Sequence, residues 1–167
     1  MSSLRKRAPK RLPAAELPDS AAAERVAVGL LARRDYASGE LAGKLGERGF
    51  EAPVIQPLIE ELRARHLLDD ERYAGHFVQY RLTRGQGPIR IRRELKEAGV
   101  TAPLIDAALA SVSDWAEIAR QVRRRRFGAK APVSWPEKGR QARFLQYRGF
   151  SNDHIRSALG PDFDPDS

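Results

Sequence analysis

Cysteine is absent from this 167-residue sequence, and no long run of apolar residues occurs in it. Without cysteine the chain has neither disulfides nor thiolate-based catalytic or zinc sites, and it suits a reducing compartment. A membrane-spanning helix needs about 20 consecutive apolar residues, so none is expected here. The basic N-terminal residues are not followed by the apolar segment of a secretory signal peptide. Together these absences predict a cytoplasmic protein that makes no contact with a membrane.

Catalytic and metal-binding patterns are also missing. His66, His76 and His154 show neither the spacing of zinc-binding histidines nor a neighbouring nucleophile. The acidic residues at 69–71 have no further ligand nearby to complete a metal site, and they favour the start of a helix. The glycines of segment 85–88 lack the Lys-Ser/Thr ending of a phosphate-binding loop and instead predict a tight connection between helices. We therefore expect no enzymatic activity, no cofactor and no metal.

A short pattern is present three times at a spacing of fifty residues. Each copy has a leucine, a glycine four residues later and an apolar residue directly after the glycine: Leu45, Gly49 and Phe50; Leu95, Gly99 and Val100; Leu145, Gly149 and Phe150. The glycine is placed where a helix ends in a left-handed conformation, which glycine adopts at little cost. A repeat of this length is typical of a small helical unit that must pack against its neighbours.

The residues after each glycine predict the start of a second helix. Thr101 and Ser151 are favourable N-caps, Glu51 is a poorer one, and Pro53 and Pro103 fall in the first turn. The apolar residue after each glycine and the isoleucines at 55, 105 and 155 have the spacing of a hydrophobic staple. Each copy therefore predicts a helix, a turn and a second helix.

A longer helix is expected before each pair, at 23–34, 72–84 and 114–127, with Asp70 and Asp114 as N-caps of the last two. Trp115 and Tyr80 belong to the apolar stripes of these helices. No segment alternates as a strand would, so the fold class is all-α: three tandem three-helix repeats stacked into an elongated, curved module. The expected domains are a disordered basic tail (1–20), three repeats (21–68, 69–112 and 113–160) and an acidic C-terminal tail (161–167).

The charge of +8 is unevenly distributed. The first repeat contains seven basic and seven acidic residues, the second seven and six, and the third eleven and four, so their net charges are 0, +1 and +7. A basic region of this kind attracts phosphates or an acidic protein surface. The candidate binding residues are Arg81, Arg84, Arg90, Arg92, Arg93, Lys96, Arg123, Arg124, Arg125, Arg126, Lys130, Lys138, Arg140, Arg143 and Arg148.

The run from Arg123 to Arg126 has two interpretations. Four consecutive helical residues point in different directions, so they cannot all face one ligand. Basic residues are also favourable at the end of a helix whatever they bind. Further basic residues in the same repeat favour binding over this purely structural role. Trp135, in the loop 128–139, is either an exposed contact or a packing residue.

Motifs in all three repeats resemble the RecX family of bacterial RecA regulators. The first repeat has Leu31-x-Arg-Arg-Asp-Tyr36 followed by Gly49-Phe50. The second has Leu68-Asp-Asp-x-Arg-Tyr-Ala74 and Gly85-x-Gly-Pro88, and the third has Phe144-Leu-x-x-Arg-Gly-Phe150. The resemblance covers about residues 24–160, and the order of these segments is more specific than any one of them. The Pro-containing loop 128–139 departs from the family pattern.

The resemblance implies a cytoplasmic, non-enzymatic protein that binds RecA. Proteins of this family lie in the groove of the RecA filament on single-stranded DNA and generally restrain its ATPase, strand-exchange and co-protease activities. A monomer is expected. Inhibition and stimulation of RecA both remain open, as do capping of filament ends and coating of the groove. The alternative is a DNA-binding helical protein that acts without RecA, although no repeat combines a short basic helix with several base-reading side chains.

Overall fold

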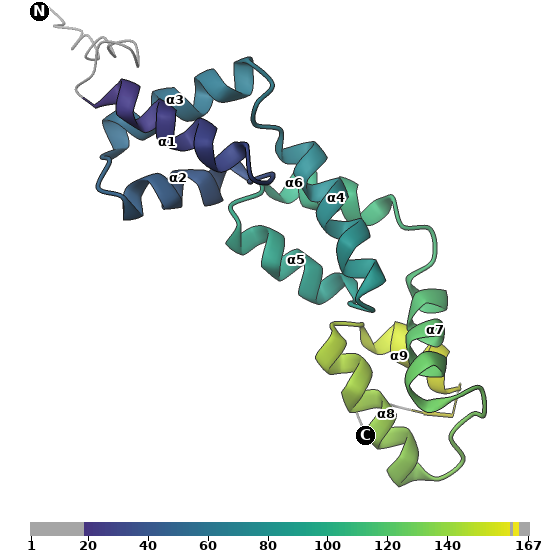
Figure 1. The fold of residues 1–167 in the computed structure, drawn as a ribbon. Coiled ribbons are helices and arrows are strands. Elements are labelled where there is room, and N and C mark those ends of the chain that lie inside the picture. The colour runs from purple at the N-terminus through teal and green to yellow at the C-terminus, as the bar shows by residue number, and fades with distance from the viewer. Residues whose placement is uncertain (1–18, 161, 164–167) are drawn as a thin grey trace, which may run out of the picture. The chain divides into compact units, whose positions relative to one another are not determined.

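The computed structural model describes residues 19–160, 162 and 163. Within this part the chain forms nine α-helices and no strand, as the all-α prediction requires (Figure 1). The helices are α1 (Ser20–Leu31), α2 (Ser38–Glu47), α3 (Ala52–Ala64), α4 (Asp70–Thr83), α5 (Pro88–Glu97), α6 (Ala102–Ala110), α7 (Trp115–Phe127), α8 (Trp135–Arg148) and α9 (Asn152–Leu159). The predicted basic tail lies almost entirely outside the described residues.

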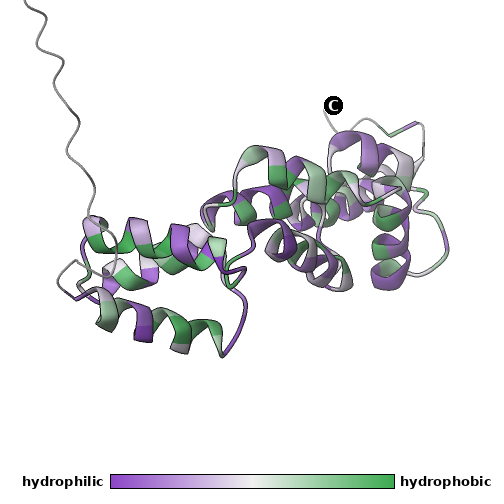
Figure 2. Cartoon of the chain, turned by 90° about the horizontal axis from the view of Figure 1, so that it is seen from above, coloured by the Kyte–Doolittle hydropathy of each residue, from purple (hydrophilic) through white to green (hydrophobic). Residues whose placement is uncertain are grey.

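The helices pack in three consecutive sets of three. Helices α1–α3 form the first bundle, α4–α6 the second and α7–α9 the third, and in each bundle every helix contacts the other two. Hydrophobic and hydrophilic residues are interspersed along the helices (Figure 2), and the buried residues are mostly apolar. The repeated leucines and isoleucines that predicted these bundles are among the buried residues: Leu45, Leu95, Leu145, Ile55, Ile105 and Ile155.

The three repeated glycines end the first helix of each pair as predicted. Gly49, Gly99 and Gly149 have φ values of 91°, 82° and 95°, which side-chain-bearing residues adopt only with strain. Val100 and Phe150 are buried beside them, and Phe50 packs partly into the first core. The turn and the staple therefore enclose the core at the same place in each bundle.

The predicted N-caps are only partly correct. Ser151 accepts a hydrogen bond from the His154 amide, and the His154 ring accepts one from the Ser151 amide, so the two residues form a capping box. Asp114 caps α7 as expected. Helix α4 instead begins earlier than predicted, because Asp69 rather than Asp70 provides the capping carboxylate and Asp70 is its first, buried residue. Thr101 occupies the N-cap position of α6 without a capping side-chain bond.

The first helix is displaced from its predicted bounds of 23–34. It begins at Ser20, since Ala23 and Ala27 are buried core residues whose small side chains the pattern did not reveal. It ends at Leu31, and Arg34 leaves the helix to form two hydrogen bonds with the Glu40 carboxylate, at 3.1 and 2.7 Å. The Arg34 guanidinium also lies 3.7 Å from the centre of the Tyr36 ring.

The chain divides after Leu68 into two compact units. The first unit contains the first bundle, and the second unit contains the second and third bundles together. The core of the third bundle includes Phe163, which belongs to the predicted acidic tail. Its ring lies 5.8 Å from that of Trp135, which is the first residue of α8 and is 59% exposed. Trp135 therefore both packs and faces solvent. Trp115 packs against the same core.

Candidate functional site: an arginine-rich junction in the second unit

Helices α5 and α8 meet end to end at the junction of the second and third bundles (Figure 1). The first amides of a helix lack partners within the helix, as do its last carbonyls. Here the Gly87 amide donates to the Arg148 carbonyl at 2.8 Å, and the Ile89 amide donates to the Gly149 carbonyl at 3.0 Å. Pro88, between them, has no amide hydrogen to satisfy. Amides at the start of α5, in the second bundle, thus provide hydrogen-bond donors for carbonyls at the end of α8, in the third bundle.

The close approach of the two backbones explains why glycine occurs at position 87, in the Gly-x-Gly-Pro segment, and at position 149, in the third copy of the repeat. A Cβ atom on Gly87 would lie 2.6 Å from the Phe150 amide nitrogen, and one on Gly149 would lie 2.7 Å from the Arg90 amide nitrogen. Neither contact is compatible with normal packing distances. The segment predicted as a tight connection between helices is therefore also a contact between bundles. We call it the Gly87–Gly149 contact.

Arg148 strengthens the junction with its side chain. Its guanidinium donates to the Arg84 carbonyl at 2.8 Å and lies 5.2 Å from the centre of the Phe144 ring. The Arg84 carbonyl is at the C-terminal end of α4, where a cation is favourable. Of the predicted binding residues, Arg148 is thus held in place by backbone of the second bundle.

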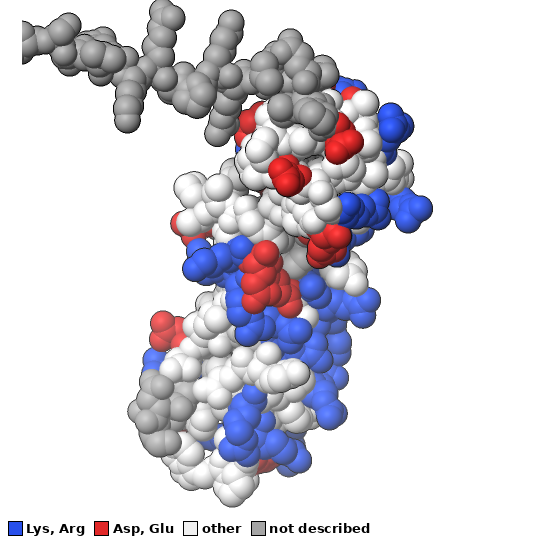
Figure 3. All heavy atoms as spheres, turned by 90° about the vertical axis from the view of Figure 1, so that its left-hand side faces the viewer, with Lys and Arg blue, Asp and Glu red and all other residues white. Residues whose placement is uncertain are grey.

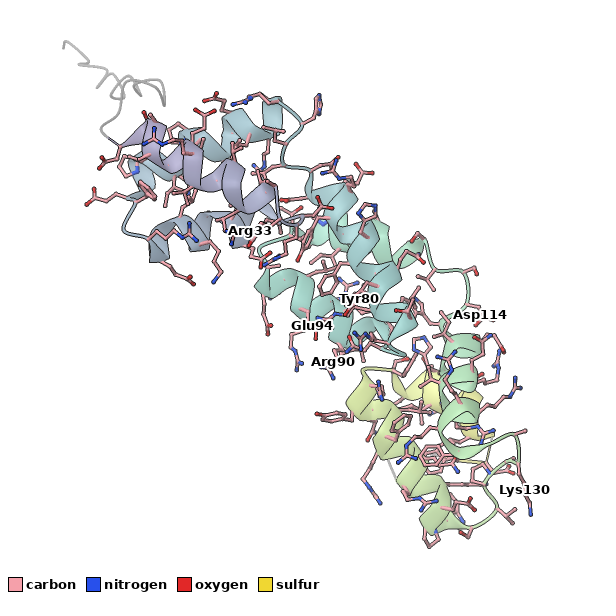
Figure 4. The ribbon with its side chains drawn as sticks, in the orientation of Figure 1. Arg33, Tyr80, Arg90, Glu94, Asp114 and Lys130 are labelled. Carbon is pink, nitrogen blue, oxygen red and sulfur yellow. The ribbon has the colours of Figure 1, made fainter. Side chains whose placement is uncertain are left out.

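Most arginines of the α4–α5 cluster have an acidic neighbour. Glu94 contacts Arg81 at 2.9 Å and Arg90 at 3.1 Å, between the two helices (Figure 4). On the exposed side, Arg92 pairs with Asp106 at 2.6 Å and Arg93 approaches Glu97 at 3.8 Å. Lys96 is exposed. Three carboxylates therefore offset part of the charge of the basic cluster predicted for the second repeat.

Arg123 is not a surface residue. Its side chain is 4% exposed and donates to the carbonyls of Gly128, Ala129 and Lys130 and to the side-chain oxygen of Gln141, at 3.1–3.3 Å. Burial, and secondarily the neighbouring Arg124, lowers the pKa of Arg123, whereas Glu137 opposes this shift. The role that the sequence analysis gave to Arg123 as a binding residue is unsuited to this position, because its donors serve the start of the α7–α8 loop.

The other three arginines of the run are exposed. Arg124 approaches Glu117 at 3.8 Å, whereas Arg125 and Arg126 line a pocket of about 160 Å³. The lining of this pocket comes from the end of α4 and the C-terminal halves of α7 and α8: Thr83, Arg84, Gly85, Val122, Arg125, Arg126, Phe144 and Arg148. Four arginines from three helices and two bundles therefore surround one cavity, and its lining contains no carboxylate.

The remaining candidate cations belong to the third bundle and its loop. Lys130 projects from the loop between α7 and α8 (Figure 4), Arg140 lies over the Phe127 ring, and Lys138 lies over the Trp135 ring. Arg143 is exposed on α8. On the face of the second unit seen in Figure 3, Lys and Arg side chains gather over a broad area. These residues extend the positive surface away from the pocket but do not line it.

Exposed aromatic and aliphatic side chains lie at the same junction. Tyr80, Ile89 and Tyr147 are 51%, 57% and 79% exposed. The Tyr80 hydroxyl accepts a hydrogen bond of 2.9 Å from Arg84, and the Arg90 guanidinium lies 5.9 Å from the centre of the Tyr147 ring. The sequence analysis placed Tyr80 on the apolar stripe of its helix, which is wrong for this residue. Its position three residues after Phe77 fitted the stripe, and only the adjacent Arg81 and Arg84 indicated an exposed, basic environment.

His154, in the third bundle, has a lowered pKa. Burial lowers the pKa of His154, although Asp153 and Asp114 oppose the shift. The neutral ring is also required by the capping box, in which Nδ1 accepts the Ser151 amide hydrogen. His154 is therefore a structural residue.

The described residues contain no group of three or more His, Cys, Asp or Glu side chains that could hold a metal ion. In the same part of the chain, none of the helices is long and apolar enough to cross a membrane. The most distinctive chemistry of the described surface is therefore its arginine-rich junction.

Family models match all three bundles in order. The first, second and third three-helix domains of RecX match residues 23–62, 69–109 and 113–159, respectively. The chain belongs to the RecX family. Curated relatives carry the same family name: regulatory protein RecX of Halorhodospira halophila is 46% identical over 140 residues, which are 83% of this chain and 87% of the relative. Regulatory protein RecX of Pseudomonas putida is 40% identical over 152 residues, 90% of this chain and 97% of the relative.

Solved structures agree with the fold. A crystal structure of regulatory protein RecX has a TM-score of 0.73 at 23% identity and covers 84% of this chain and 72% of that one. RecX from Lactobacillus salivarius gives the same TM-score at 20% identity, covering 84% of this chain and 94% of that one. At these identities the likeness supports the helical fold alone, and the family relationship rests on the sequence matches.

Proposed function

We propose that this RecX-family protein binds the RecA filament on single-stranded DNA and lowers its ATPase, strand-exchange and co-protease activities. The observation that carries the proposal is the ordered match of all three RecX domains across residues 23–159. The curated relatives are named regulatory proteins. A regulator that works by binding needs a recognition surface rather than a catalytic centre, and the bundles offer such surfaces on a cytoplasmic, monomeric protein.

The charge of the second unit supports a polyanionic partner. Its basic residues outnumber its acidic ones, and most of the excess belongs to residues 113–160. The first bundle has equal numbers of both, and several of its arginines are paired, as Arg65 is with Glu24 at 2.7 Å. A nucleoprotein filament exposes phosphates and acidic side chains, so we expect the second unit to make the electrostatic contacts.

The test is the ATPase rate of RecA on single-stranded DNA as this protein is added. We expect the rate to fall with increasing protein and the protein to co-sediment with filaments. An unchanged rate together with no co-sedimentation would disprove the proposal, and a higher rate would replace inhibition with stimulation. The same additions of heat-denatured protein serve as the control, because they show how added salt and protein mass affect the ATPase rate.

Filament length at low protein-to-RecA ratios separates two modes of action. If the protein caps growing ends, a small fraction of bound protein stops elongation while existing filaments keep their structure. If it lies in the groove, the effect grows in proportion to the RecA protomers covered. Imaging filaments at several ratios measures which dependence holds.

The alternative function is binding to DNA without RecA. The observation that favours it is the contact of exposed Tyr80 with Arg84, which has no ion pair in the described residues, since aromatic and basic side chains together suit single-stranded nucleic acid. Binding to DNA in the absence of RecA, together with no effect on the RecA ATPase, would favour this alternative over filament regulation.

A further inference from the structure

We propose that the pocket formed by Arg84, Arg125, Arg126 and Arg148 binds a backbone phosphate of single-stranded DNA while Tyr80 stacks on an adjacent base. This inference rests on the proposed function, because single-stranded DNA is the strand on which RecA assembles. It adds a specific site, its ligand group and the strand type that the site selects.

None of the four arginines has an ion pair within the described residues, in contrast to several other arginines of the second unit. Glu94, Asp106, Glu97 and Glu117 lie beside other arginines. The contacts of the pocket arginines are instead with rings, a hydroxyl and a carbonyl: Arg84 with Tyr80, Arg126 with Phe127, and Arg148 with Phe144 and the Arg84 carbonyl. Their guanidinium groups therefore keep donors for an anion.

The size of the cavity favours a small anionic group. Cavities that hold a whole drug-sized molecule are about 300–1,000 Å³, whereas this one is about 160 Å³. Val122 and Phe144 give it apolar walls, which reduce the screening of charges by water. Arginine forks suit phosphate oxygens in particular, because two N–H groups can bind two oxygens of one group.

The position of Tyr80 indicates the rest of the ligand. Its ring is 51% exposed, and its hydroxyl is held at 2.9 Å by Arg84, which lines the pocket. A base attached to the bound phosphate could therefore stack on this ring. In a duplex the bases are already stacked and paired with one another, so the ring would find no free base face. The combination thus favours a single strand over a duplex.

The junction gives the pocket a fixed form. Its arginines come from both bundles of the second unit, and the Gly87–Gly149 contact together with the Arg148 side chain joins those bundles. Gly85 completes the wall with a φ of 69°, where an added Cβ would lie 3.2 Å from the Val122 side chain. The cations are therefore held apart by backbone packing before the ligand arrives, which lowers the entropy cost of binding.

The experiment measures binding of a short fluorescein-labelled oligothymidylate by fluorescence anisotropy, without RecA. The full-length protein is compared with the Arg125→Gln/Arg126→Gln variant and with Arg92→Gln/Arg93→Gln, which loses the same charge from α5. We expect the pocket variant to bind about tenfold or more weakly and the control to change less than about threefold. Equal losses would overturn the site in favour of diffuse electrostatics. Circular dichroism and thermal unfolding establish that both variants fold.

Salt dependence gives a second readout. Each phosphate contact on a single strand contributes about 0.7 to the slope of log K against log salt concentration. The pocket variant should therefore have a smaller slope than the control variant. If both variants keep the wild-type slope, no phosphate contact was removed and the proposal fails.

Tyr80 and the strand type test the stacking part. Tyr80→Ala should weaken binding by about tenfold, whereas Tyr80→Phe keeps the ring and should retain most of the affinity. The same oligonucleotide annealed to its complement should bind more weakly. Equal affinity for the duplex, or no effect of Tyr80→Ala, would disprove stacking.

Two further outcomes identify the ligand and keep the proposals separate. Inorganic pyrophosphate is added as a competitor. If it displaces the oligonucleotide at a concentration comparable to that of the oligonucleotide's phosphates, the pocket is a free-phosphate site and the DNA assignment is wrong. The RecA ATPase assay is run in parallel. Oligonucleotide binding without any effect on RecA would leave the pocket standing and disprove the proposed function. If the pocket variant alone no longer inhibits the RecA ATPase, the result supports both the pocket and the proposed function.

Discussion

Gly87 and Arg148 are joined by a backbone hydrogen bond of 2.8 Å, although they belong to different bundles. The bond connects the first amides of α5 with the last carbonyls of α8, two groups that a helix leaves without partners. Glycine at positions 87 and 149 lets the two backbones approach this closely. The junction therefore depends on the absence of side chains at two specific positions.

Gly87→Ala should destabilise the second unit by about 1–3 kcal/mol, because the new Cβ has no room beside the Gly149 carbonyl and the Phe150 amide. Denaturant unfolding followed by circular dichroism measures the change. The matched control is Gly75→Ala, within α4, where an added Cβ meets nothing within 4 Å. That substitution should be neutral or stabilising by up to about 1 kcal/mol. Similar losses in both variants would contradict this explanation of the Gly-x-Gly-Pro motif.

Arg123→Lys should destabilise the third bundle by about 1–3 kcal/mol, although the charge is kept. A lysine cannot reach the three loop carbonyls and Gln141 that the buried guanidinium satisfies, so several acceptors lose their partner. Thermal unfolding of the purified protein measures this loss. Arg124→Lys, at the exposed neighbouring position, serves as the control and should change stability by less than about 0.5 kcal/mol. Equal losses of stability in the two variants would contradict the buried position of Arg123.

The stability of the third bundle should fall as the pH is lowered from neutral through the range near 6. The folded state holds the pKa of His154 below its ordinary value, so the unfolded chain binds more protons in this range and gains stability relative to the folded one. The stabilising contribution is thus complete above about pH 6.5 and is lost as the pH falls toward the lowered pKa. Protonation of Nδ1 also removes the acceptor for the Ser151 amide.

The comparison for His154 is His154→Gln, since glutamine at this helix position can accept the same amide hydrogen without titrating. The difference in unfolding free energy between the two proteins, measured from pH 7.5 to 5.5, cancels the contributions of His66 and His76. We expect the wild type to lose stability relative to the variant as the pH falls. A difference that stays constant across this range would contradict the assignment.

Phe163→Ala should cost about 1.5–3 kcal/mol, because the side chain is 6% exposed and packs into the third core beside Trp135. Denaturant unfolding measures the loss, and the fluorescence of Trp135 should report it as well. Val133→Ala is the control, at a residue that is 79% exposed. No loss of stability in Phe163→Ala would mean that residues 161–167 act only as an acidic tail.

Charge reversal at Arg124 and Arg125 should weaken filament binding more than charge reversal at Arg33 and Arg48. All four are exposed, and each variant changes the net charge equally. The first pair belongs to the strongly basic third bundle and the second pair to the neutral first bundle. Co-sedimentation with RecA filaments at two salt concentrations measures the difference. Equal losses would contradict a contact through the third bundle.

Much of the fold was accessible from the sequence, because the glycine ends, the proline starts and the isoleucine staples are local signals that depend on backbone conformation. The three helices before these pairs were predicted as well, but the bounds of α1 were not. Its core face is made partly of Ala23 and Ala27, which composition does not distinguish from exposed alanines. The contribution of Phe163 to the core was missed for a similar reason, since its neighbours are acidic and proline residues.

The candidate site was less accessible. The sequence identified the basic residues but not which of them are neutralised, because the partners of Arg81 and Arg92 come from other helices. It also could not separate Arg123 from Arg124 to Arg126, since only the path of the α7–α8 loop brings carbonyls to the buried guanidinium. The pocket combines the end of α4 with the C-terminal halves of α7 and α8, and its existence depends on packing between bundles.

The Gly87–Gly149 contact also has a consequence for local opening of the native state. The amides of Gly87 and Ile89 belong to the second bundle, yet their acceptors are carbonyls of the third. These two amides should therefore exchange with solvent deuterium only when α8 separates or unfolds. A substitution that weakens only the third bundle would accelerate exchange at positions 87 and 89, within its neighbour. The three domains that the repeat defines would then open as two cooperative units, with the boundary at Leu68.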